Sequence, residues 1–353
     1  MSTLRDVALR AGVSVGSASA VINEAGTASA EMIRRVRKAS EELGYQPDGV
    51  ARSLKTGRTR TIGLVIPDIA NPHFANLAKA IEIGADRAGY ALMLSNTTDD
   101  PDKEVRLLRL MRMQRVDGLI LVPCGIEPSH TEAIRKAFPA PIVMLDRVLR
   151  GLDYDSVVLD NRAASRMVTE YLIRAGHRRI GIVTGPPSIS ISTERLDGAQ
   201  EALAENGIAF DEKLVEWDAF QSEPAYRATI ALLHKRPRPT AILSTSCHTT
   251  IGVMKALADQ GFQCPQDISV AAIDDFEWAN AFSPQLTTAA QPIDEIGSQA
   301  VERLLARLDG RASGAAKHIV LTPRLIVRNS CRVIGSARLG RPARAPIAQQ
   351  ESD

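Results

Sequence analysis

Short apolar runs that alternate with amphipathic helical stretches constrain this chain more than any other feature. From residue 61 onwards, Ile62–Ile66, Gly118–Val122 and Ile142–Leu145 are continuous apolar runs. A helical stretch follows the first run and has one apolar face, made of Phe74, Leu77, Ala78, Ile81 and Ala85. A further strand at 91–94 and a helix over 107–113 belong to the same series. Strands that are apolar throughout are typical of a parallel sheet covered by helices on both faces, so we expect an α/β fold.

The same pattern starts a second time after Asn161. A helical stretch over 163–175 leads to the apolar run Ile180–Val183, and further strands are expected at 214–217, 241–243 and 270–273. Two such units in succession predict two lobes with a cleft between them. Ligands of parallel sheets bind beyond the carboxyl ends of the strands, so binding residues are expected where strands end.

The motifs of α/β enzymes are missing where an enzyme would need them. The first strand leads into neither GxGxxG nor GxxxxGK[ST], no strand leads into a GxSxG elbow, and there is no HExxH. We therefore expect no catalytic residues, no cofactor and no metal. An enzyme with an α/β cleft is the first alternative.

Three helices are predicted within the first 45 residues. Thr3 and Asp6 have the spacing of a capping box, and the helix that they start stops at Gly12. Ser14 is placed to cap a second helix, which runs to about Asn23 with Val15, Ala18, Val21 and Ile22 as its inner face. A third helix, 30–43, ends before Gly44. Two short helices joined by a tight turn describe a helix-turn-helix. The alternative is a three-helix bundle that never meets DNA.

Positive charge is concentrated at this end of the chain. Residues 1–60 hold 10 Lys/Arg and 6 Asp/Glu, a net charge of +4, whereas the remainder holds 33 and 35, a net charge of −2. Such an excess is expected where a protein meets a polyanion. The segment 49–55 is long enough for one or two helical turns, which need a partner or DNA for stability, and a basic linker follows it at 56–60.

Several stretches resemble the lactose-repressor (LacI/GalR) family of bacterial transcriptional regulators in order and spacing. They are LRDVA at 4–8, AGVS at 11–14, VIN at 21–23, ELGYQP at 42–47, and ARSL at 51–54 followed by Thr56 and Gly57. The resemblance continues to about Arg328. It implies a helix-turn-helix head (1–46), a hinge helix and linker (47–60), a two-lobed periplasmic-binding-protein-like sensor (61–335) and a flexible tail (336–353).

The resemblance also implies how the lobes are assembled. The N-lobe would comprise 61–160 and 292–322, and the C-lobe 161–291 and 323–335. The chain would cross between the lobes near Asp160, Gln291 and Thr322.

The DNA-contacting residues are implied by the same resemblance. Val15, Gly16 and Ala20 would face base edges in the major groove, and Leu54 would wedge into the minor groove at the operator centre. The remaining implied contacts are Ser14, Ser17, Ser19, Asn23, Arg52 and Lys55. Many family members carry larger or polar side chains at 15, 16 and 20. Specificity here is therefore expected to depend more on apolar contacts, the hinge and DNA shape.

An effector pocket is implied between the lobes. Its expected residues are His73, Phe74, Arg147, Asp160, Arg195, Phe220, Ser246, Cys247 and Asp275. Arg195 suits this role because its planar fork can donate two parallel hydrogen bonds to a carboxylate or diol. For Phe74 the alternative is a place in the apolar core, and for Arg147 an ion pair with Asp146 or Asp160.

One departure from the family suggests an effector class. Sugar-responsive members carry Asn-Asp where this chain has Ser246-Cys247, so an acidic pocket group is lost. With Arg147, Arg195, His73 and His248 retained, the cleft is expected to be electropositive. The hypothesis is an anionic effector, either a sugar acid or another carboxylate metabolite.

The sequence also predicts where the protein is located in the cell and what it binds. Cys124, Cys247, Cys264 and Cys331 are far apart and form no CxxC pair, so they are expected to be reduced thiols. No apolar signal segment or membrane span is present, which indicates a cytoplasmic protein without a membrane partner. A helix-turn-helix dimer reads two half-sites, so the expected partners are a palindromic operator in double-stranded DNA and a second copy of the chain, as a homodimer or a tetramer. The second alternative is a periplasmic-type solute-binding protein. Whether the effector releases DNA or acts as co-repressor is left open.

Overall fold

The computed structural model describes residues 2–22, 28–45, 57–124, 128–149, 151 and 153–335. The chain forms two compact units, a head (Met1–Arg60) and a sensor (Thr61–Asp353), which are described separately. The expected tail, 336–353, residue 46 of the expected head, and residues 47–56 of the expected hinge and linker lie outside the described residues. No helix in the described part of the chain is long and apolar enough to cross a membrane.

The head is a bundle of three helices: α1 (Leu4–Ala11), α2 (Val15–Ile22) and α3 (Ala30–Glu42). The capping box is present, because the Thr3 hydroxyl accepts from the Asp6 amide and the Asp6 carboxylate accepts from the Thr3 amide. Gly12 ends α1 with φ of +64°, a left-handed conformation that costs glycine little. The buried core joins all three helices through Val7, Ala18, Val21 and Val36.

The expected inner face of α2 is wrong at one position. Val15 is 45% exposed, whereas Ala18 and Val21 are buried. Position 15 is the first residue of α2, and with a period of 3.6 residues it lies about 60° from position 18 and about 120° from position 21 around the helix. Val15 is therefore left on the outer surface of the head.

The N-lobe is a sheet of parallel strands in the order β11-β5-β4-β3-β1-β2. Its strands are β1 (Thr61–Ile66), β2 (Ala91–Asn96), β3 (Gly118–Leu121), β4 (Ile142–Leu145), β5 (Asp155–Leu159) and β11 (His318–Leu321). The helices that cover it are α5 (Pro72–Arg87), α6 (Pro101–Met113), α7 (Pro128–Ala137) and α12 (Ile293–Leu308).

The C-lobe repeats this plan in the order β12-β10-β9-β8-β6-β7. Its strands are β6 (Ile180–Thr184), β7 (Val215–Trp217), β8 (Ala241–Ser244), β9 (Ser269–Ile273), β10 (Thr287–Ala290) and β12 (Arg324–Ile326). Its helices are α8 (Asn161–Arg174), α9 (Ser190–Glu205), α10 (Ser222–His234) and α11 (Cys247–Asp259), with 3-10 turns at Glu212–Leu214 and Glu277–Asn280. β12 pairs antiparallel with β10, an exception to the expected parallel arrangement.

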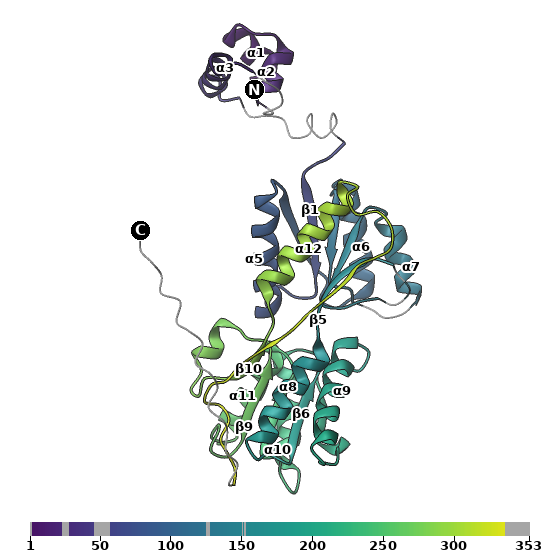
Figure 1. Ribbon diagram of the computed structural model, residues 1–353, viewed down its shortest axis with the longest axis vertical. Helices are drawn as coiled ribbons and strands as arrows, with labels where there is room; N and C mark the ends of the chain where they lie inside the picture. The colour runs from purple at the N-terminus through teal and green to yellow at the C-terminus, as the bar shows by residue number, and fades with distance from the viewer. Residues whose placement is uncertain are drawn as a thin grey trace. The chain divides into compact units, whose positions relative to one another are not determined.

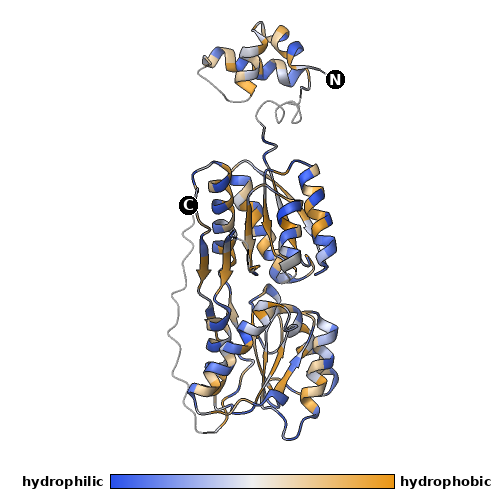
Figure 2. Cartoon of the chain, turned by 90° about the vertical axis from the view of Figure 1, so that its right-hand side faces the viewer, coloured by the Kyte–Doolittle hydropathy of each residue, from blue (hydrophilic) through white to orange (hydrophobic). Residues whose placement is uncertain are grey.

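The central strands of each sheet are buried on both faces, which explains their continuous apolar runs, whereas the edge strands β2, β7 and β11 are partly exposed. In β1, Leu64 packs with α5 and α12 on one side, and Val65 packs with α6 and α7 on the other. In the C-lobe, Ile182 faces α8 and α9, while Val183 faces α10 and α11. Each such side chain contributes roughly 1.5–3 kcal/mol to the folded state. Figure 2 shows the resulting layers, with hydrophobic strands inside.

The chain passes between the two sheets three times. It leaves the N-lobe after β5 and enters α8 at Asn161, returns between β10 and α12, and leaves again between β11 and β12. The helix α12 packs against α5 in the N-lobe (Figure 1). A Cβ added at Gly297 would lie 2.7 Å from Cβ of Ala80, so only a glycine permits this approach.

Helix starts depend on caps that the apolar pattern does not reveal. The helix expected from Leu107 begins six residues earlier, at Pro101. There, the Asp100 carboxylate accepts from the amides of Asp102 and Lys103, and Pro101 occupies a position that needs no amide donor. The strands β5, β10, β11 and β12 are additional to those expected, because they are short or lack a continuous apolar run.

His177 attaches the last described segment to the C-lobe. It is fully buried, its Nε2 donates to the carbonyl of Arg332 at 3.2 Å, and its Nδ1 accepts from the Thr240 hydroxyl at 2.9 Å. The amide of Ile334 also donates to the carbonyl of Ala175. Burial lowers the pKa of His177 to about 4, because the neutral ring alone suits this environment.

We predict that His177 makes the sensor sensitive to acid. Its pKa is lower in the folded state than the ordinary value of 6.5, so its stabilising contribution is complete above pH 6.5 and is lost as the pH falls from 6.5 to 4. The loss approaches about 3 kcal/mol, at roughly 1.4 kcal/mol per pKa unit. Denaturant unfolding across this range measures it. His177→Gln should flatten the pH dependence, and His234→Gln, which changes an exposed histidine, should leave it as in the wild type. Equal profiles for wild type and His177→Gln would contradict the assignment.

Candidate functional site

The outer face of α2 is the candidate DNA-binding surface of the head. The Ser14 hydroxyl caps α2 by accepting from the Ser17 amide at 3.0 Å, and Ser14, Val15 and Gly16 are exposed. Ser17, Ser19 and Ala20 are partly exposed. The face is thus lined by small and apolar side chains with serine hydroxyls beside them. Of the other expected contacts, Asn23, Arg52, Leu54 and Lys55 lie outside the described residues.

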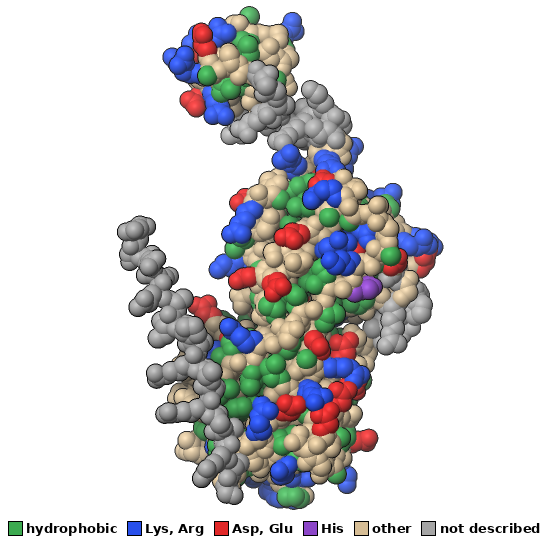
Figure 3. Space-filling model, in the orientation of Figure 1, with side chains coloured by type: hydrophobic (Ala, Val, Ile, Leu, Met, Phe, Trp, Pro, Cys, Tyr) green, Lys and Arg blue, Asp and Glu red, His purple; other side chains and the backbone are tan. Residues whose placement is uncertain are grey.

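The exposed basic side chains of the head lie mainly on another helix, α3. Arg34, Arg35, Arg37 and Lys38 on α3 are exposed, and Lys and Arg side chains are visible on the surface of the head in Figure 3. Cationic side chains on a helical head are suited to contact phosphates, which position a protein on DNA without reading its sequence.

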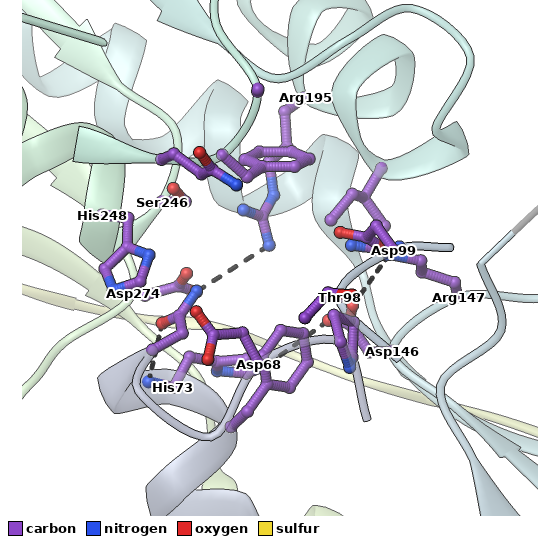
Figure 4. A pocket seen from close by; sticks show the side chains of 17 residues that line it. Asp68, His73, Thr98, Asp99, Asp146, Arg147, Arg195, Ser246, His248 and Asp274 are labelled. Atoms are coloured by element: carbon purple, nitrogen blue, oxygen red, sulfur yellow. Dashed lines mark hydrogen bonds and ion pairs between the residues drawn. The ribbon is translucent and has the colours of Figure 1, made fainter. Parts of the chain in front are cut away.

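A cavity of about 140 Å³ lies between the lobes of the sensor, at the carboxyl ends of strands from both sheets. One water molecule needs roughly 10–15 Å³ by the same measure, so the cavity has room for a small organic molecule. The N-lobe contributes Pro67, Asp68, Asn71, His73, Phe74, Thr98, Asp99, Asp146 and Arg147. The C-lobe contributes Ile191, Arg195, Ala219, Phe220, Gln221, Ser246, His248 and Asp274. Figure 4 shows their side chains converging from the two lobes.

Six of the expected effector residues line this cavity: His73, Phe74, Arg147, Arg195, Phe220 and Ser246. Three lie elsewhere. The Asp160 carboxylate caps α8 by accepting from the Ala163 amide at 2.8 Å. Cys247 is fully buried in the core beside α10 and α11, where burial raises the pKa of its thiol. Asp275 faces away from the cavity wall and forms an ion pair with Arg328 at 2.7 Å.

Sequence reasoning overlooked one group of cavity residues. Thr98 and Asp99 follow β2 and have φ of +59° and +54°, which turns the chain sharply at the strand end. The neighbours of β2 in a parallel sheet all end at the same edge, so the rule about strand ends applied to β2 would have found them. Ile191 in the first turn of α9, and Ala219 and Gln221 just before α10, also reach the wall, and no motif marks them in the sequence.

Arg195 connects three segments of the C-lobe at the cavity. It is 1% exposed, its Nε donates to the Asn161 side-chain oxygen at 2.9 Å, and its Nη1 donates to the carbonyl of Thr245. Its Nη2 lies 3.8 Å from the carboxylate of Asp274. The fixed fork of the guanidinium thus positions the start of α8 and the end of β8 relative to each other.

The charges of the cavity contradict the expected electropositive character. Arg147 pairs with Asp99 and lies 3.7 Å from Asp146, and Arg195 faces Asp274. With Asp68 also in the wall, four carboxylates face two guanidinium groups and two histidines. The expectation followed from the loss of one acidic position and left the carboxylates of Asp68, Asp99, Asp146 and Asp274 out of the charge balance.

His73 and Asp146 form a buried pair at the cavity, with Nε2 and Oδ1 3.5 Å apart. Burial alone lowers the pKa of His73, but the nearby carboxylates of Asp274 and Asp146 outweigh it and raise that pKa. Burial alone would raise the pKa of Asp146, whereas its contacts with His73 and the charge of Arg147 lower it. Within the described residues, His73 Nε2, Asp146 Oδ2 and Arg147 Nε are buried without a hydrogen-bond partner. His73 Nε2 and Arg147 Nε lie 3.5 and 3.7 Å from the Asp146 carboxylate, so attraction between opposite charges compensates for the missing hydrogen bonds.

Two aromatic rings give the cavity its apolar surfaces. Phe74 lies on α5 with its ring 5.0 Å from that of His73. Phe220 belongs to a small apolar cluster with Ile189 and Ile191 and has φ of +53°, a strained conformation for a non-glycine residue. The Asp218 carboxylate holds this turn, since it accepts from the Phe220 amide at 2.8 Å.

We predict that Gly185 controls where the Phe220 ring lies. A Cβ at position 185 would be 2.2 Å from two ring carbons of Phe220, so Gly185→Ala must displace the ring. The expected cost is about 1–3 kcal/mol of unfolding free energy, typical of overpacking. Denaturant unfolding of the two single variants and the pair Gly185→Ala/Phe220→Ala measures it. Removing the ring should abolish the effect of Gly185→Ala, and additive effects would contradict the assignment.

We also predict that His73 titrates above its ordinary pKa. Because the folded state favours the charged ring, the stabilisation from His73 is present below pH 6.5 and is lost as the pH rises through the raised value. His73→Gln should therefore lower the unfolding free energy most near pH 6 and least in alkaline solution. Titration of the His73 ring protons by NMR measures the pKa directly. A midpoint at or below 6.5 would refute the prediction.

A small helical head followed by a two-lobed α/β sensor defines this protein as a ligand-responsive DNA-binding regulator. Two family models match this chain, one in the head and one in the sensor. Residues 3–48 match the family described as bacterial regulatory proteins, lacI family, and residues 169–331 match a periplasmic binding protein-like domain. The chain belongs to the lacI family of bacterial regulatory proteins. It is a transcriptional regulator rather than an enzyme or a transport receptor.

Curated relatives and solved structures cover nearly the whole chain. The HTH-type transcriptional repressor PurR of Klebsiella pneumoniae is 35% identical, over 94% of this chain and 97% of its own length. The ribose operon repressor of Haemophilus influenzae is 34% identical, over 94% and 98%. The Lac repressor dimer bound to operator and the anti-inducer ONPF is 28% identical with a TM-score of 0.81, covering 94% and 99%. The complex of the transcriptional regulator CelR with cellobiose is 29% identical with a TM-score of 0.71, covering 94% and 100%.

Proposed function

We propose that this protein is a sequence-specific transcriptional repressor whose affinity for its operator is controlled by a neutral, polyhydroxylated metabolite bound between the lobes. The observation that carries the effector class is the composition of the cavity wall. Carboxylates, guanidinium groups and the Ser246 hydroxyl stand beside two aromatic rings in the wall. Carboxylates accept from hydroxyls, guanidinium groups donate to them, and aromatic faces cover the C–H face of a sugar ring.

An anionic effector has less support. Both arginines already have carboxylate partners, Arg147 with Asp99 and Asp146, and Arg195 with Asp274. A ligand carboxylate would therefore meet Asp68, Asp99, Asp146 and Asp274 without surplus positive charge. Like charges brought together in a buried site cost several kcal/mol. A sugar acid is thus replaced by a neutral sugar as the proposed class.

Relatives support the same class. One is named a ribose operon repressor, and a solved relative is a complex with cellobiose. The effector-binding residues that we propose for this chain are the six expected ones that line the cavity together with Asp146 and Asp274. Their proposed roles are hydrogen bonding for the charged residues and Ser246, and stacking for Phe74 and Phe220.

The head is proposed to bind a palindromic operator as part of a homodimer. A solved relative is a dimer bound to operator, and helix-turn-helix dimers read two half-sites. Ser14, Val15, Gly16, Ser17, Ser19, Ala20 and Asn23 are the proposed contacts of the head. Arg52, Leu54 and Lys55 are the proposed contacts of the hinge, with Leu54 as the minor-groove wedge.

We propose that effector binding and operator binding are coupled because the effector binds two states of the protein with different affinities. An effector that moves operator occupancy from nearly complete to nearly absent must bind the two states with affinities that differ by about 5.5 kcal/mol. Opening and closing of the lobes about the three crossings is the motion that we propose for this purpose.

The DNA-binding part of the proposal is tested with genomic DNA. The full-length protein is incubated with sheared DNA of its source at near-physiological salt, and the retained fragments are sequenced. A few palindromic sites are expected, and uniform retention of all fragments would refute sequence-specific binding. Adding neutral sugars to the same assay shows whether the effector releases the operator or is needed to hold it.

The effector class is tested with matched compounds. Titration calorimetry compares D-ribose, D-galactose and D-glucose with their aldonic acids and with the corresponding amino sugars. We expect a neutral sugar to bind at least about tenfold more tightly than its acid, a difference of about 1.4 kcal/mol. Tighter binding of an acid would restore the carboxylate hypothesis, and tighter binding of an amino sugar would indicate a cationic effector.

A further inference from the structure

A chain of hydrogen bonds runs from a buried carboxylate to the cavity wall. Asp218 is 7% exposed and does not line the cavity, and its Oδ2 accepts from the Thr249 hydroxyl at 2.6 Å. The Thr249 and Ser246 hydroxyl oxygens are 2.7 Å apart, and Ser246 lines the cavity. The Thr249 amide also donates to the Ser246 hydroxyl oxygen at 3.2 Å.

The carboxylate sets the direction of this chain. Asp218 receives a hydrogen bond at each oxygen, from the Phe220 amide and from the Thr249 hydroxyl. The 2.6 Å separation is in the range of hydrogen bonds from a hydroxyl to an ionised carboxylate. Burial raises the pKa of Asp218, and these two hydrogen bonds oppose that effect. An ionised carboxylate can only accept, so Thr249 must use its single hydroxyl proton on Asp218.

The direction of the Thr249 hydroxyl proton determines which hydrogen-bonding group Ser246 presents to the cavity. With its own proton given to Asp218, Thr249 can only accept from Ser246, and the Ser246 proton is committed in turn. One lone pair of Ser246 receives the Thr249 amide, which leaves the second lone pair as its remaining hydrogen-bonding group. Toward the cavity Ser246 is therefore an acceptor.

We propose that Asp218 and Thr249 are specificity-determining residues, which hold Ser246 as a hydrogen-bond acceptor and thereby select a ligand that donates at this point of the cavity. The inference rests on the proposed function, because it takes the cavity as the effector site. A ligand with a hydroxyl or N–H beside Ser246 is favoured. A ligand with an ether oxygen, a carbonyl or a fluorine there is rejected, since two acceptors would face each other in a buried site.

The same carboxylate positions the neighbouring aromatic surface. Asp218 Oδ1 holds the Phe220 amide, and Gly185 leaves space for the ring. The donor selected at Ser246 and the ring stacked on Phe220 thus depend on one buried residue. Asp218 acts through Ser246 and Phe220 and is a positioning residue.

The first test needs no ligand. Neutron diffraction from crystals of the deuterated full-length protein at pH 8 locates the hydroxyl deuterons. The expected result is deuterium on Thr249 Oγ1 directed at Asp218, and deuterium on Ser246 Oγ directed at Thr249. Deuterium on the Asp218 carboxyl group, or on Ser246 directed into the cavity, would overturn the inference. This result is independent of whether any sugar binds, so it separates failure of the inference from failure of the proposed effector class.

The second test reverses the donor and acceptor roles along this series of hydrogen bonds. In Asp218→Asn the amide oxygen can keep the Phe220 amide while the amide nitrogen donates to Thr249. Thr249 then donates to Ser246, and the Ser246 proton becomes free to point into the cavity. Thr249→Val instead removes the hydroxyl that connects Asp218 to Ser246. Thr229→Val is the matched control, because Thr229 is a fully buried helical threonine whose hydroxyl donates to the Ala225 carbonyl outside the cavity.

Calorimetry compares the best-binding neutral sugar with its series of monodeoxy-fluoro derivatives. In the wild type and in Thr229→Val, fluorine at one position should weaken binding about tenfold, the value of one buried hydrogen bond that is lost. In Asp218→Asn and Thr249→Val that penalty should shrink to threefold or less. Thermal unfolding checks that each variant is folded. An unchanged penalty in both variants would overturn the inference, and absence of binding by every sugar would reject the effector class while the neutron result still decides the direction of the chain.

Discussion

Neither lobe of the sensor is formed by one continuous part of the chain, and the rest of the structure depends on this constraint. Three crossings carry the backbone between the two sheets, so α12 and β11 complete the N-lobe although they come after most of the C-lobe. The apolar surface of α12 packs into the N-lobe core with α5 and β1. Because both cores need the crossings, the three crossing segments hold the lobes together. The cavity lies between the lobes and is lined by residues of both.

The cavity combines strong polar groups with little net charge. Buried ions are stable when they are paired, since an isolated charge in a protein interior is costly. The pairs Arg147–Asp99, His73–Asp146 and Arg195–Asp274 provide that compensation. The same pairing leaves few free cations for an anionic ligand, and it leaves several donors and acceptors for a neutral one. The ion pairs that stabilise these buried charges therefore also underlie the proposed choice of a neutral effector.

The cavity is also connected to the crossing segments between the lobes. The Gln291 side chain at the second crossing donates to the Asp274 carboxylate at 2.5 Å, and Asp160 at the first crossing caps α8. Asp274 faces Arg195, which in turn holds Asn161 at the start of α8. A ligand that changes the surroundings of Asp274 or Arg195 acts on groups that contact the crossing segments directly. Contacts of this kind give a bound molecule a physical route to the relative position of the lobes.

The sequence by itself determined the layered architecture and the helix-turn-helix head, because apolar periodicity, caps and motif spacing are local properties of the chain. The family resemblance implied a place for Arg195 and Phe74 in the pocket, and both line the cavity. Tertiary structure decided the rest. Val15 lies outside the head core because of helix phase. Asp275 pairs with Arg328 and Cys247 is buried in the C-lobe core, while Asp274 and Ser246 line the cavity. Such choices between adjacent residues depend on the direction of each side chain at a strand end. The charge of the cavity likewise follows from which carboxylates meet there across the two lobes, and spacing along the chain does not encode that meeting.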